Sequence, residues 1–351
     1  MAEISLCMIV RNEEDVLERC LNSIRNDVDE IIIADTGSTD RTKEIAAQFT
    51  SHIFDYPWDD DFAAARNFAF SKATKDYQMW LDADDIVADA DAIGKLKENL
   101  TADVVMLPYH VTFAEDGAPA MSYFRERILK RSRKFRWVGA VHECITPSGK
   151  IVYGDAAILH KKVHAGDPDR NLRIYEKLLA AGAELTPREQ YYYARELYYH
   201  HRYADAADGF ERFLKTDGWK EDRIGACLQL SACRIAMGDP EGAKAALLRS
   251  FLWDMPRAEV CCELGRLFFE EKQWSEAIVW YKAALDAPYP SAGFTQADCH
   301  DYIPYLQLCV CYDRLGNLRE AHAYNEKAGR IRPESAAFLA NRTYFMNQQA
   351  F

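Results

Sequence analysis

The stretch DYQMWLDADD, residues 76–85, runs from an apolar strand directly into a cluster of carboxylates. Its first half has the composition of a strand that is covered on both faces of a sheet. Its second half holds Asp82, Asp84 and Asp85. Three carboxylates at the end of a buried strand are energetically unfavourable unless a cation or hydrogen-bond donors neutralise them. Asp82 and Asp84 are two residues apart, so both can reach one ion, and ligands with oxygen atoms only favour Mg²⁺ or Mn²⁺. A solvated acidic turn is the alternative, with Asp85 as the N-cap of a helix that starts at Ile86.

Three further apolar runs precede this stretch, and each is followed by a helical pattern. The strands are expected at residues 4–10, 30–34 and 52–54, and the helices at residues 16–24, 41–49 and 62–73. With the strand that leads into Asp82, the order is β-α-β-α-β-α-β, which implies a parallel sheet with right-handed crossovers. Ligands of such sheets bind beyond the carboxyl ends of the strands.

Polar side chains follow the first two strands. Arg11, Asn12 and Glu13 come after the first strand, and Asp35 and Ser38 come at the end of the second. Asp35 closes an apolar strand, where a carboxylate is costly without a donor, and the N–H of a nucleobase would be such a donor. The simpler reading of the second turn is that it only caps the next helix.

The helix expected at residues 62–73 is rich in alanine and carries Arg66 and Asn67. Small side chains would let this helix approach a ligand closely. The alternative is that the two polar residues are an ordinary exposed pair.

Four motifs, in this order, resemble those of family 2 inverting glycosyltransferases of the GT-A fold. They are CMIVRNEE at residues 7–14, IADTGSTD at 33–40, ARN at 65–67 and LDADD at 81–85. The resemblance covers residues 1–165 and implies an α/β, Rossmann-like domain with a mostly parallel sheet. One departure is Thr36, where many members carry a second Asp, and this leaves the contact to base or ribose open.

The resemblance also implies roles for individual residues. Asp35 would contact the uracil of a UDP-sugar, Asp82 would hold ribose and metal, and Asp84 would hold the metal on the diphosphate. A histidine after the last strand often completes the metal shell, which points to His160, with His164 as the alternative. The remaining residues that the resemblance assigns to the nucleotide sugar are Val10, Arg11, Glu13, Ser38, Arg66, Asn67 and Ala83.

Residues 125–136 contain seven basic side chains and one acidic one, in a chain that is acidic overall. A mobile loop that neutralises a leaving diphosphate would have this composition, with Arg127, Arg131 and Arg136 as the candidates. A solvated strand and turn is the alternative. A hairpin turn is expected just before, at residues 115–117.

An inverting transfer requires one general base for the acceptor proton. Glu143, with His142 beside it, is the candidate by its place in the chain, and Val141-His142-Glu143 resembles the motif of a subgroup that is fused to helical repeats. The Q-x-x-R-W signature of processive synthases is absent around Trp137, which favours transfer of a single sugar.

The second half of the chain, from residue 166 to 351, is expected to be an all-α solenoid. Alanines that open successive second helices stand at 206, 243, 277 and 321, with spacings of 37, 34 and 44 residues. The middle value equals the tetratricopeptide period, and an insert near residues 289–298 accounts for the longest. Such solenoids present a groove suited to peptides. The alternatives are a structural buttress or a homodimerisation module.

Composition excludes several classes of protein. The chain has 351 residues and a net charge of −12, which argues against nucleic-acid binding. The segment Met1–Val10 lacks the features of a signal peptide, and no run approaches the length of a transmembrane segment. The ten cysteines show no paired metal-binding spacing and are expected to be buried and reduced, which favours a cytoplasmic protein.

The leading hypothesis is a metal-dependent inverting glycosyltransferase that uses Mn²⁺ or Mg²⁺ and a UDP-linked hexose or N-acetylhexosamine. The acceptor would be a peptide or protein side chain, because a GT-A domain followed by repeats resembles the bacteriocin peptide S-glycosyltransferases. A lipid-linked or cell-surface glycan is the alternative acceptor. A non-catalytic interaction protein is the third hypothesis, and it predicts erosion of the strand-end carboxylates, which are intact.

Overall fold

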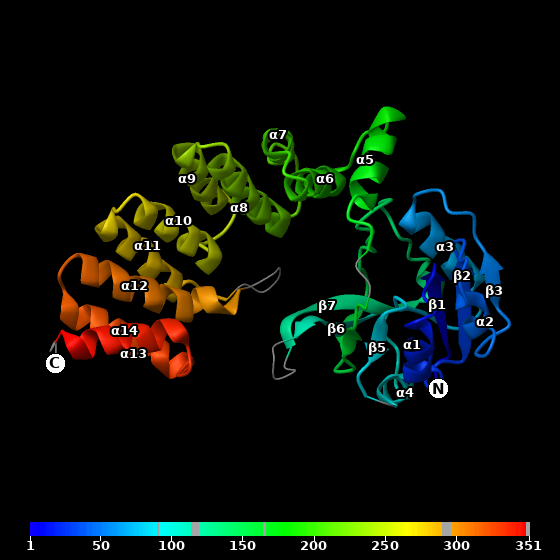
Figure 1. Cartoon of the computed structure of the whole chain (residues 1–351). Coiled ribbons are helices and arrows are strands. Elements are labelled where there is room, and N and C mark those ends of the chain that lie inside the picture. The colour runs from blue at the N-terminus through cyan, green and yellow to red at the C-terminus, as the bar shows by residue number, and fades with distance from the viewer. Residues whose placement is uncertain (90, 114–118, 164–165, 290–295, 349–351) are drawn as a thin grey trace. The chain divides into compact units, whose positions relative to one another are not determined.

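The computed structural model describes residues 1–89, 91–113, 119–163, 166–289 and 296–348, and the chain divides into two compact units, Met1–Ala183 and Glu184–Phe351 (Figure 1). The first unit includes helix α5 (Arg170–Ala180), which the sequence boundary at residue 165 places in the second domain. Tyr175 of this helix is fully buried, and its hydroxyl donates a hydrogen bond to the Val141 carbonyl oxygen at 3.5 Å. Contacts of this kind explain why α5 packs with the first unit.

The first unit is built on a nine-stranded sheet with the strand order β3-β2-β1-β4-β7-β6-β9-β5, and β8 pairs with β6. Strands β3, β2, β1 and β4 are parallel, as the β-α-β pattern predicts, whereas β7 runs antiparallel to both β4 and β6. The strands are β1 (Ile4–Val10), β2 (Glu30–Asp35), β3 (Ile53–Asp55), β4 (Tyr77–Trp80), β5 (Asp85–Val87), β6 (Val104–Phe113), β7 (Pro119–Lys130), β8 (Ile151–Tyr153) and β9 (Ile158–His160).

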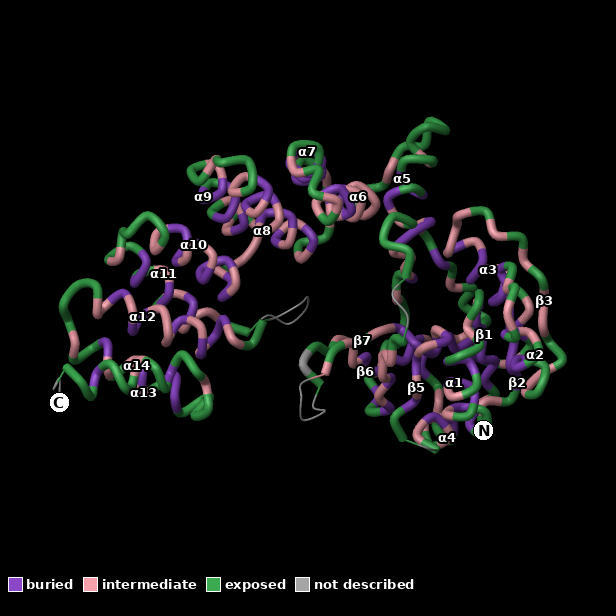
Figure 2. Tube along the Cα trace, viewed as in Figure 1, coloured by how far each residue is buried: buried purple, intermediate pink, exposed green. Residues whose placement is uncertain are grey.

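Two hydrophobic clusters cover the two faces of the parallel strands. Leu6 and Met8 of β1 belong to one cluster, and Cys7 between them belongs to the other, because side chains alternate along a strand. Figure 2 shows that β1 and the strands beside it are largely buried, which confirms the expectation of strands covered on both faces.

The helices of the first unit close these clusters. They are α1 (Leu17–Ile24), α2 (Thr42–Ala46), α3 (Phe62–Lys72), α4 (Ala92–Lys97) and α5. Helix α1 buries Leu17, Cys20, Leu21 and Ile24, which are spaced three or four residues apart along one face. Helix α3 begins where the Asp61 carboxylate accepts a hydrogen bond from the Ala64 N–H at 2.8 Å, a standard N-cap.

Two sequence-based alternatives are decided by the sheet. Asp85 is not a helix cap: it begins β5, which pairs antiparallel with β9 so that Asp85 faces His160. The first half of the basic run is not a loop, because residues 125–130 belong to β7; a short 3-10 turn η1 (Arg131–Arg133) and an irregular segment follow. The hairpin turn expected at residues 115–117 lies outside the described residues.

The second unit consists of paired helices, as the repeat pattern predicts. Helix α6 begins with a complete capping box, in which Thr186 and Glu189 satisfy each other's backbone N–H groups. The alanines at 206, 243, 277 and 321 are fully buried between paired helices. The helices are α6 (Pro187–Tyr199), α7 (Tyr203–Phe213), α8 (Lys220–Ala236), α9 (Pro240–Arg249), α10 (Ala258–Glu270), α11 (Trp274–Asp286), α12 (Tyr302–Arg314), α13 (Leu318–Ile331) and α14 (Ala336–Asn347).

Close packing explains the small residues of the second unit. A Cβ added at Gly265 of α10 would lie 2.8 Å from the ring of Tyr281 on α11, so only glycine fits there. None of the helices in the described part of the chain has the length and apolar character needed to cross a bilayer.

Candidate active site

A cavity of about 620 Å³ lies at the carboxyl ends of the parallel strands of the first unit. The turn after β1, the turn after β4, the segment at 141–143 and the end of β9 all reach it. The structure thus brings most of the predicted site residues to one cavity. They are Val10, Arg11, Glu13, Arg66, Asp82, Ala83, Asp84, His142, Glu143 and His160.

The turn after β1 is tied to the turn after β2 by hydrogen bonds. The Asn12 N–H donates to the Ser38 hydroxyl at 3.0 Å, and the Thr39 N–H donates back to the Asn12 side-chain oxygen at 2.8 Å. The Glu13 N–H donates to the Thr42 hydroxyl at 2.7 Å. Ser38 is therefore occupied in supporting the first turn, and it is not one of the residues that line the cavity.

Asp35 is buried just behind the cavity wall, next to Thr36, which does line it. Its Oδ1 accepts hydrogen bonds from the N–H groups of Gly37 and Ser38 at 3.0 and 2.9 Å. Its Oδ2 has no hydrogen-bond partner among the described residues, although it is fully shielded from solvent. A buried carboxylate oxygen without a donor is unfavourable, so this atom fits a donor supplied from outside the chain.

Asp84, Asp85 and His160 form a group that could hold a metal ion, since one ligand atom of each lies within 4.8 Å of the others. The His160 Nδ1 is 3.4 Å from Oδ1 of Asp84 and 3.4 Å from Oδ1 of Asp85. Hydrogen bonds to the carboxylates of Asp84, the larger cause, and of Asp85 raise the pKa of His160 to about 10. The predicted metal set was Asp82, Asp84 and His160; in the structure Asp85 pairs with His160 across β5 and β9, whereas Asp82 is not part of this group.

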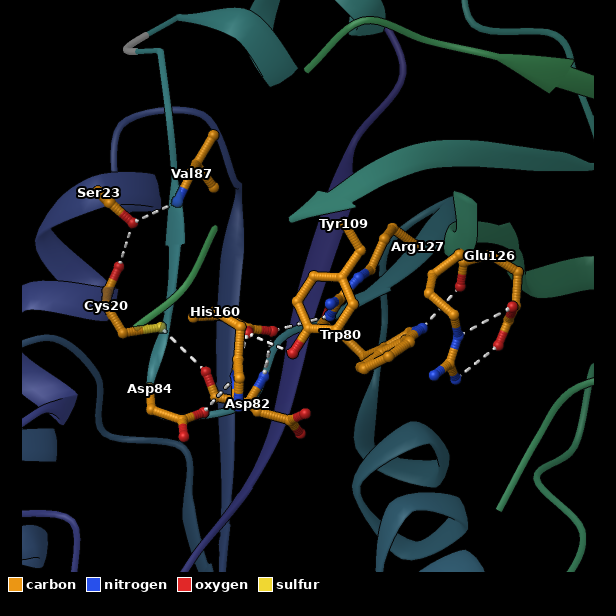
Figure 3. A network of polar contacts seen from close by, with 12 residues as sticks. Cys20, Ser23, Trp80, Asp82, Asp84, Val87, Tyr109, Glu126, Arg127 and His160 are labelled. Atoms are coloured by element: carbon orange, nitrogen blue, oxygen red, sulfur yellow. Dashed lines mark hydrogen bonds and ion pairs between the residues drawn. The ribbon is translucent and has the colours of Figure 1, made fainter. Parts of the chain in front are cut away.

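Asp85 is held by a network of polar contacts, and Figure 3 shows Arg127, Tyr109 and His160 of that network. The Arg127 guanidinium lies 3.0 Å from Asp85 Oδ2, and both side chains are fully buried. The Tyr109 hydroxyl donates to Asp85 Oδ1 at 3.0 Å, and the Asp82 N–H donates to Asp85 Oδ2 at 3.1 Å. The guanidinium also lies 3.8 Å from the ring centroid of Trp80 and 4.4 Å from that of Tyr109.

Arg66 also lines the cavity and contacts two of its carboxylates. Its terminal nitrogen is 2.7 Å from Asp82 Oδ1, and its Nε is 2.6 Å from Glu143 Oε1. The guanidinium packs against the rings of Trp80 and Trp137, at 5.1 and 4.9 Å from their centroids, and the two indoles contact each other edge to face at 5.0 Å. Burial alone would raise the pKa of Asp82, but the charge of Arg66 and of the arginines nearby outweighs burial and lowers that pKa to about 2.

Glu143 and His142 lie in a tight turn that is closed by a β-bridge between Val138 and Cys144. His142 has a φ of 53°, a left-handed conformation that is uncommon outside glycine. Gly139 in the same turn has a φ of 92°. The bridge and the Arg66 ion pair together fix the Glu143 carboxylate at the cavity wall.

Several predicted residues are not brought to the cavity. Arg127 is buried behind it, and the role of a mobile diphosphate-binding arginine is therefore wrong for this residue. Arg131 and Arg136 follow β7, whose last residue pairs with Tyr77, so they emerge at the start of β4 and not at its carboxyl end. Asn67 is also elsewhere: its amide donates to and accepts from the backbone of Trp137, at 2.9 and 3.0 Å.

Other residues line the cavity without having been predicted. Trp58 and Phe62 contact each other at 4.7 Å between ring centroids, and Arg170 of α5 lies 4.7 Å from the Phe62 ring. Lys162 and Asn171 complete this side. The spacing of the two aromatic residues, four apart where a helix begins, could have indicated that both line the cavity. Arg170 could not be found in this way, because the sequence-based boundary assigned it to the other domain.

Comparisons with known proteins agree with this geometry. Residues 5–152 match the family model described as Glycosyl transferase family 2. A TPR repeat-containing protein of Synechococcus elongatus is 39% identical over 149 residues, which cover 42% of this chain and 36% of that protein. The SPbeta prophage-derived glycosyltransferase SunS of Bacillus subtilis is 27% identical over 228 residues, which cover 60% of this chain and 53% of that protein. The match therefore spans between about a third and a half of the length of these relatives.

One similar solved structure is that of YrrB, described as a TPR protein with an unusual peptide-binding site. Its sequence is 20% identical to this chain and the TM-score is 0.39; the match covers 50% of this chain and 84% of YrrB. The family match covers the strands and motifs that build the cavity, and paired helices follow it. Residues 5–152 of this chain therefore form a family 2 glycosyl transferase domain, followed by a helical region of the tetratricopeptide type.

Proposed function

We propose that this protein is a metal-dependent inverting glycosyltransferase that takes a hexose or N-acetylhexosamine from a nucleotide sugar, most simply a UDP-sugar. The observation that carries the proposal is the single cavity in which the turn after β1, the carboxylates after β4, His160 and Glu143 meet. The unpartnered Oδ2 of Asp35 supports a nucleobase N–H as its donor.

The donor set around His160 suits a divalent ion, because it combines carboxylate oxygens with an imidazole. Asp84 and His160 would hold the ion, since Asp85 already pairs with Arg127 and Asp82 with Arg66. When bound, the ion would neutralise the charge that develops on a leaving diphosphate. Asp82 would face the ribose and diphosphate of the donor.

Glu143 would act as the general base. It lies at the cavity wall, fixed by the Arg66 guanidinium at 2.6 Å, and one base is what a single inverting displacement requires. The acceptor loses its proton to Glu143 as it attacks the anomeric carbon, and the bond to the diphosphate breaks on the opposite side. His142 beside it would help to orient the acceptor.

The acceptor we propose is a peptide or protein side chain. Solenoids of paired helices commonly bind peptides on their concave surface, and this general property supports a peptide acceptor. The arrangement of domains also resembles the bacteriocin peptide S-glycosyltransferases. Trp58, Phe62 and Arg170 line the cavity, and the Phe62 N–H donates to the Ala140 carbonyl oxygen at 2.9 Å, in the turn that carries Glu143. We propose that the acceptor enters on this side.

The test is thermal unfolding with UDP and Mn²⁺, followed by donor hydrolysis and peptide glycosylation measured by mass spectrometry. UDP with Mn²⁺ should stabilise the protein by mass action, and Asp84→Asn should remove most of that effect. Glu143→Gln should keep the stabilisation and lower the transfer rate by about 10²–10⁴.

Asp89→Asn, which changes an exposed carboxylate near the same loop, is the control and should behave as the wild type. No stabilisation of the wild type by any nucleotide with metal, and equal loss in Asp84→Asn and Asp89→Asn, would each contradict the proposal.

A further inference from the structure

A second groove, of about 970 Å³, lies at the other end of the sheet from the candidate active site. The start of β4, the end of α3 and the turn after β7 line it. Tyr77, which lines this groove, and Asp82, which lines the first cavity, are five residues apart along an extended segment, or roughly 16 Å. The two sites are therefore separate.

The second groove is strongly basic in a chain whose net charge is −12. Lys130, Arg131, Lys134 and Arg136 line it, against a single carboxylate, that of Asp76. That carboxylate also accepts a hydrogen bond from the Glu3 N–H at 3.1 Å. The cationic side chains thus outnumber the one acidic group in the groove.

Most of these cations have no acidic partner among the described residues. In the described part of the chain, no ion pair involves the side chains of Lys130, Lys134 or Arg136. Arg131 donates from Nε to the Lys75 carbonyl oxygen at 2.5 Å, which fixes its guanidinium beside the groove. Arg133, in contrast, is not part of the groove and faces Asp103 at 3.9 Å.

The rest of the groove is suited to an organic molecule. Phe70, Phe135 and Leu100 provide apolar surface, and Ser132 provides a hydroxyl group. The volume falls within the range of pockets that enclose small ligands, roughly 300–1,000 Å³.

We propose that this groove binds a soluble ligand that carries phosphate groups. Four cations within seven residues match a compact dianion, and guanidinium groups bind phosphate through paired N–H donors. The carboxylates of an extended acidic peptide are spread at about 3.3 Å per residue, a poorer match for this density. The surface of a bilayer does not enter a concave site, so the concavity favours a soluble molecule. This site is independent of the proposed glycosyl transfer.

The experiment is calorimetric titration of the full chain with inorganic pyrophosphate in EDTA, which removes any divalent ion from the first cavity. The groove variant is Lys134→Glu/Arg136→Glu, in which both residues are exposed. The matched control is Arg25→Glu/Lys95→Glu, two exposed cations outside the groove that change the net charge equally. We expect the wild type and the control to bind, and the groove variant to bind at least about tenfold more weakly.

Lys134→Gln/Arg136→Gln provides a second test if the charge reversal disturbs folding, and it should also weaken binding. Equal binding by the groove variant and the control, loss in both, or no binding by the wild type would overturn the proposal. Polyglutamate and vesicles of phosphatidylcholine with phosphatidylglycerol serve as competing probes. Binding of either one without binding of pyrophosphate would assign the groove to an acidic peptide or a membrane instead.

Discussion

Replacement of Arg127 by methionine tests whether the buried pair with Asp85 supports the floor of the cavity. The guanidinium lies 3.0 Å from the carboxylate, and both side chains are fully buried. Methionine keeps an unbranched chain between Trp80 and Tyr109 but removes the guanidinium from the buried Asp85 carboxylate, whose remaining cationic neighbour is His160 at 3.4 Å. Removing one partner of a buried ion pair costs about 3–5 kcal/mol, and we expect a destabilisation of the first unit in that range.

The double variant Arg127→Met/Asp85→Asn separates the cost of the unpaired charge from the loss of contacts. Asparagine carries no charge, and its one oxygen can accept from the Asp82 N–H in place of Asp85 Oδ2. Its NH2 group then takes the place of Oδ1 and can donate to the Tyr109 hydroxyl oxygen, which accepts as well as donates. Two nitrogens of Arg127, Nε and one terminal nitrogen, have no hydrogen-bond partner among the described residues, so the wild-type pair is itself imperfect. The double variant should recover at least about 2 kcal/mol relative to Arg127→Met.

Hydrogen exchange measured by mass spectrometry is the suitable assay, because a chain of two units does not unfold in one step. Peptides from β1 and β4 report the opening free energy of the first unit, and peptides from α10 and α11 serve as the internal reference. A loss of less than about 1 kcal/mol in Arg127→Met, or a double variant as unstable as the sum of the single variants, would refute the reasoning.

Three further outcomes are expected. Burial raises the pKa of Asp222 to about 6, above its ordinary value of 3.8. The folded state therefore holds this proton more tightly than the unfolded state, and the second unit should be most stable below about pH 4. It should lose about 3 kcal/mol of unfolding free energy as the pH rises to about 6. Denaturant titrations across this range should show the loss in the wild type and not in Asp222→Asn. Gly265→Ala should destabilise the second unit by about 1–3 kcal/mol, since the new Cβ meets the Tyr281 ring, and a melting temperature equal to that of the wild type would contradict this. Asn67→Ala should expose the backbone of Trp137 to faster exchange and cost about 1–3 kcal/mol, whereas unchanged exchange would show that the two hydrogen bonds are dispensable.

The parts of the fold that were predictable have strong local patterns. The apolar run at Ile4–Val10 forms a central strand, and the spacing of Leu17, Cys20, Leu21 and Ile24 gives the buried face of α1. Motifs that follow parallel strands must meet at one edge of the sheet, so the convergence of Arg11, Asp82 and their neighbours could be inferred from their order alone.

The positions of the arginines around β7 and of Asp85 could not be predicted, because they depend on the direction in which a strand runs in the sheet. Charge density alone suggested a loop around Arg127, but a strand that returns antiparallel carries no local signal of its direction. The pairing of Lys130 with Tyr77 sends Arg131 and Arg136 to the far edge of the sheet. The role of Asp85 was missed for a similar reason, because only the pairing of β5 with β9 brings it to His160.

The two ion pairs of Arg66, with Asp82 and with Glu143, restrict which amino acids can occupy position 66. The planar guanidinium reaches Asp82 with one nitrogen and Glu143 with another, and it packs beside the contacting indole rings of Trp80 and Trp137. An ammonium group is a single point of charge and cannot match that fork, and a neutral side chain would leave two acids facing each other. Arginine is therefore the residue expected at position 66 wherever Asp82 and Glu143 are both retained.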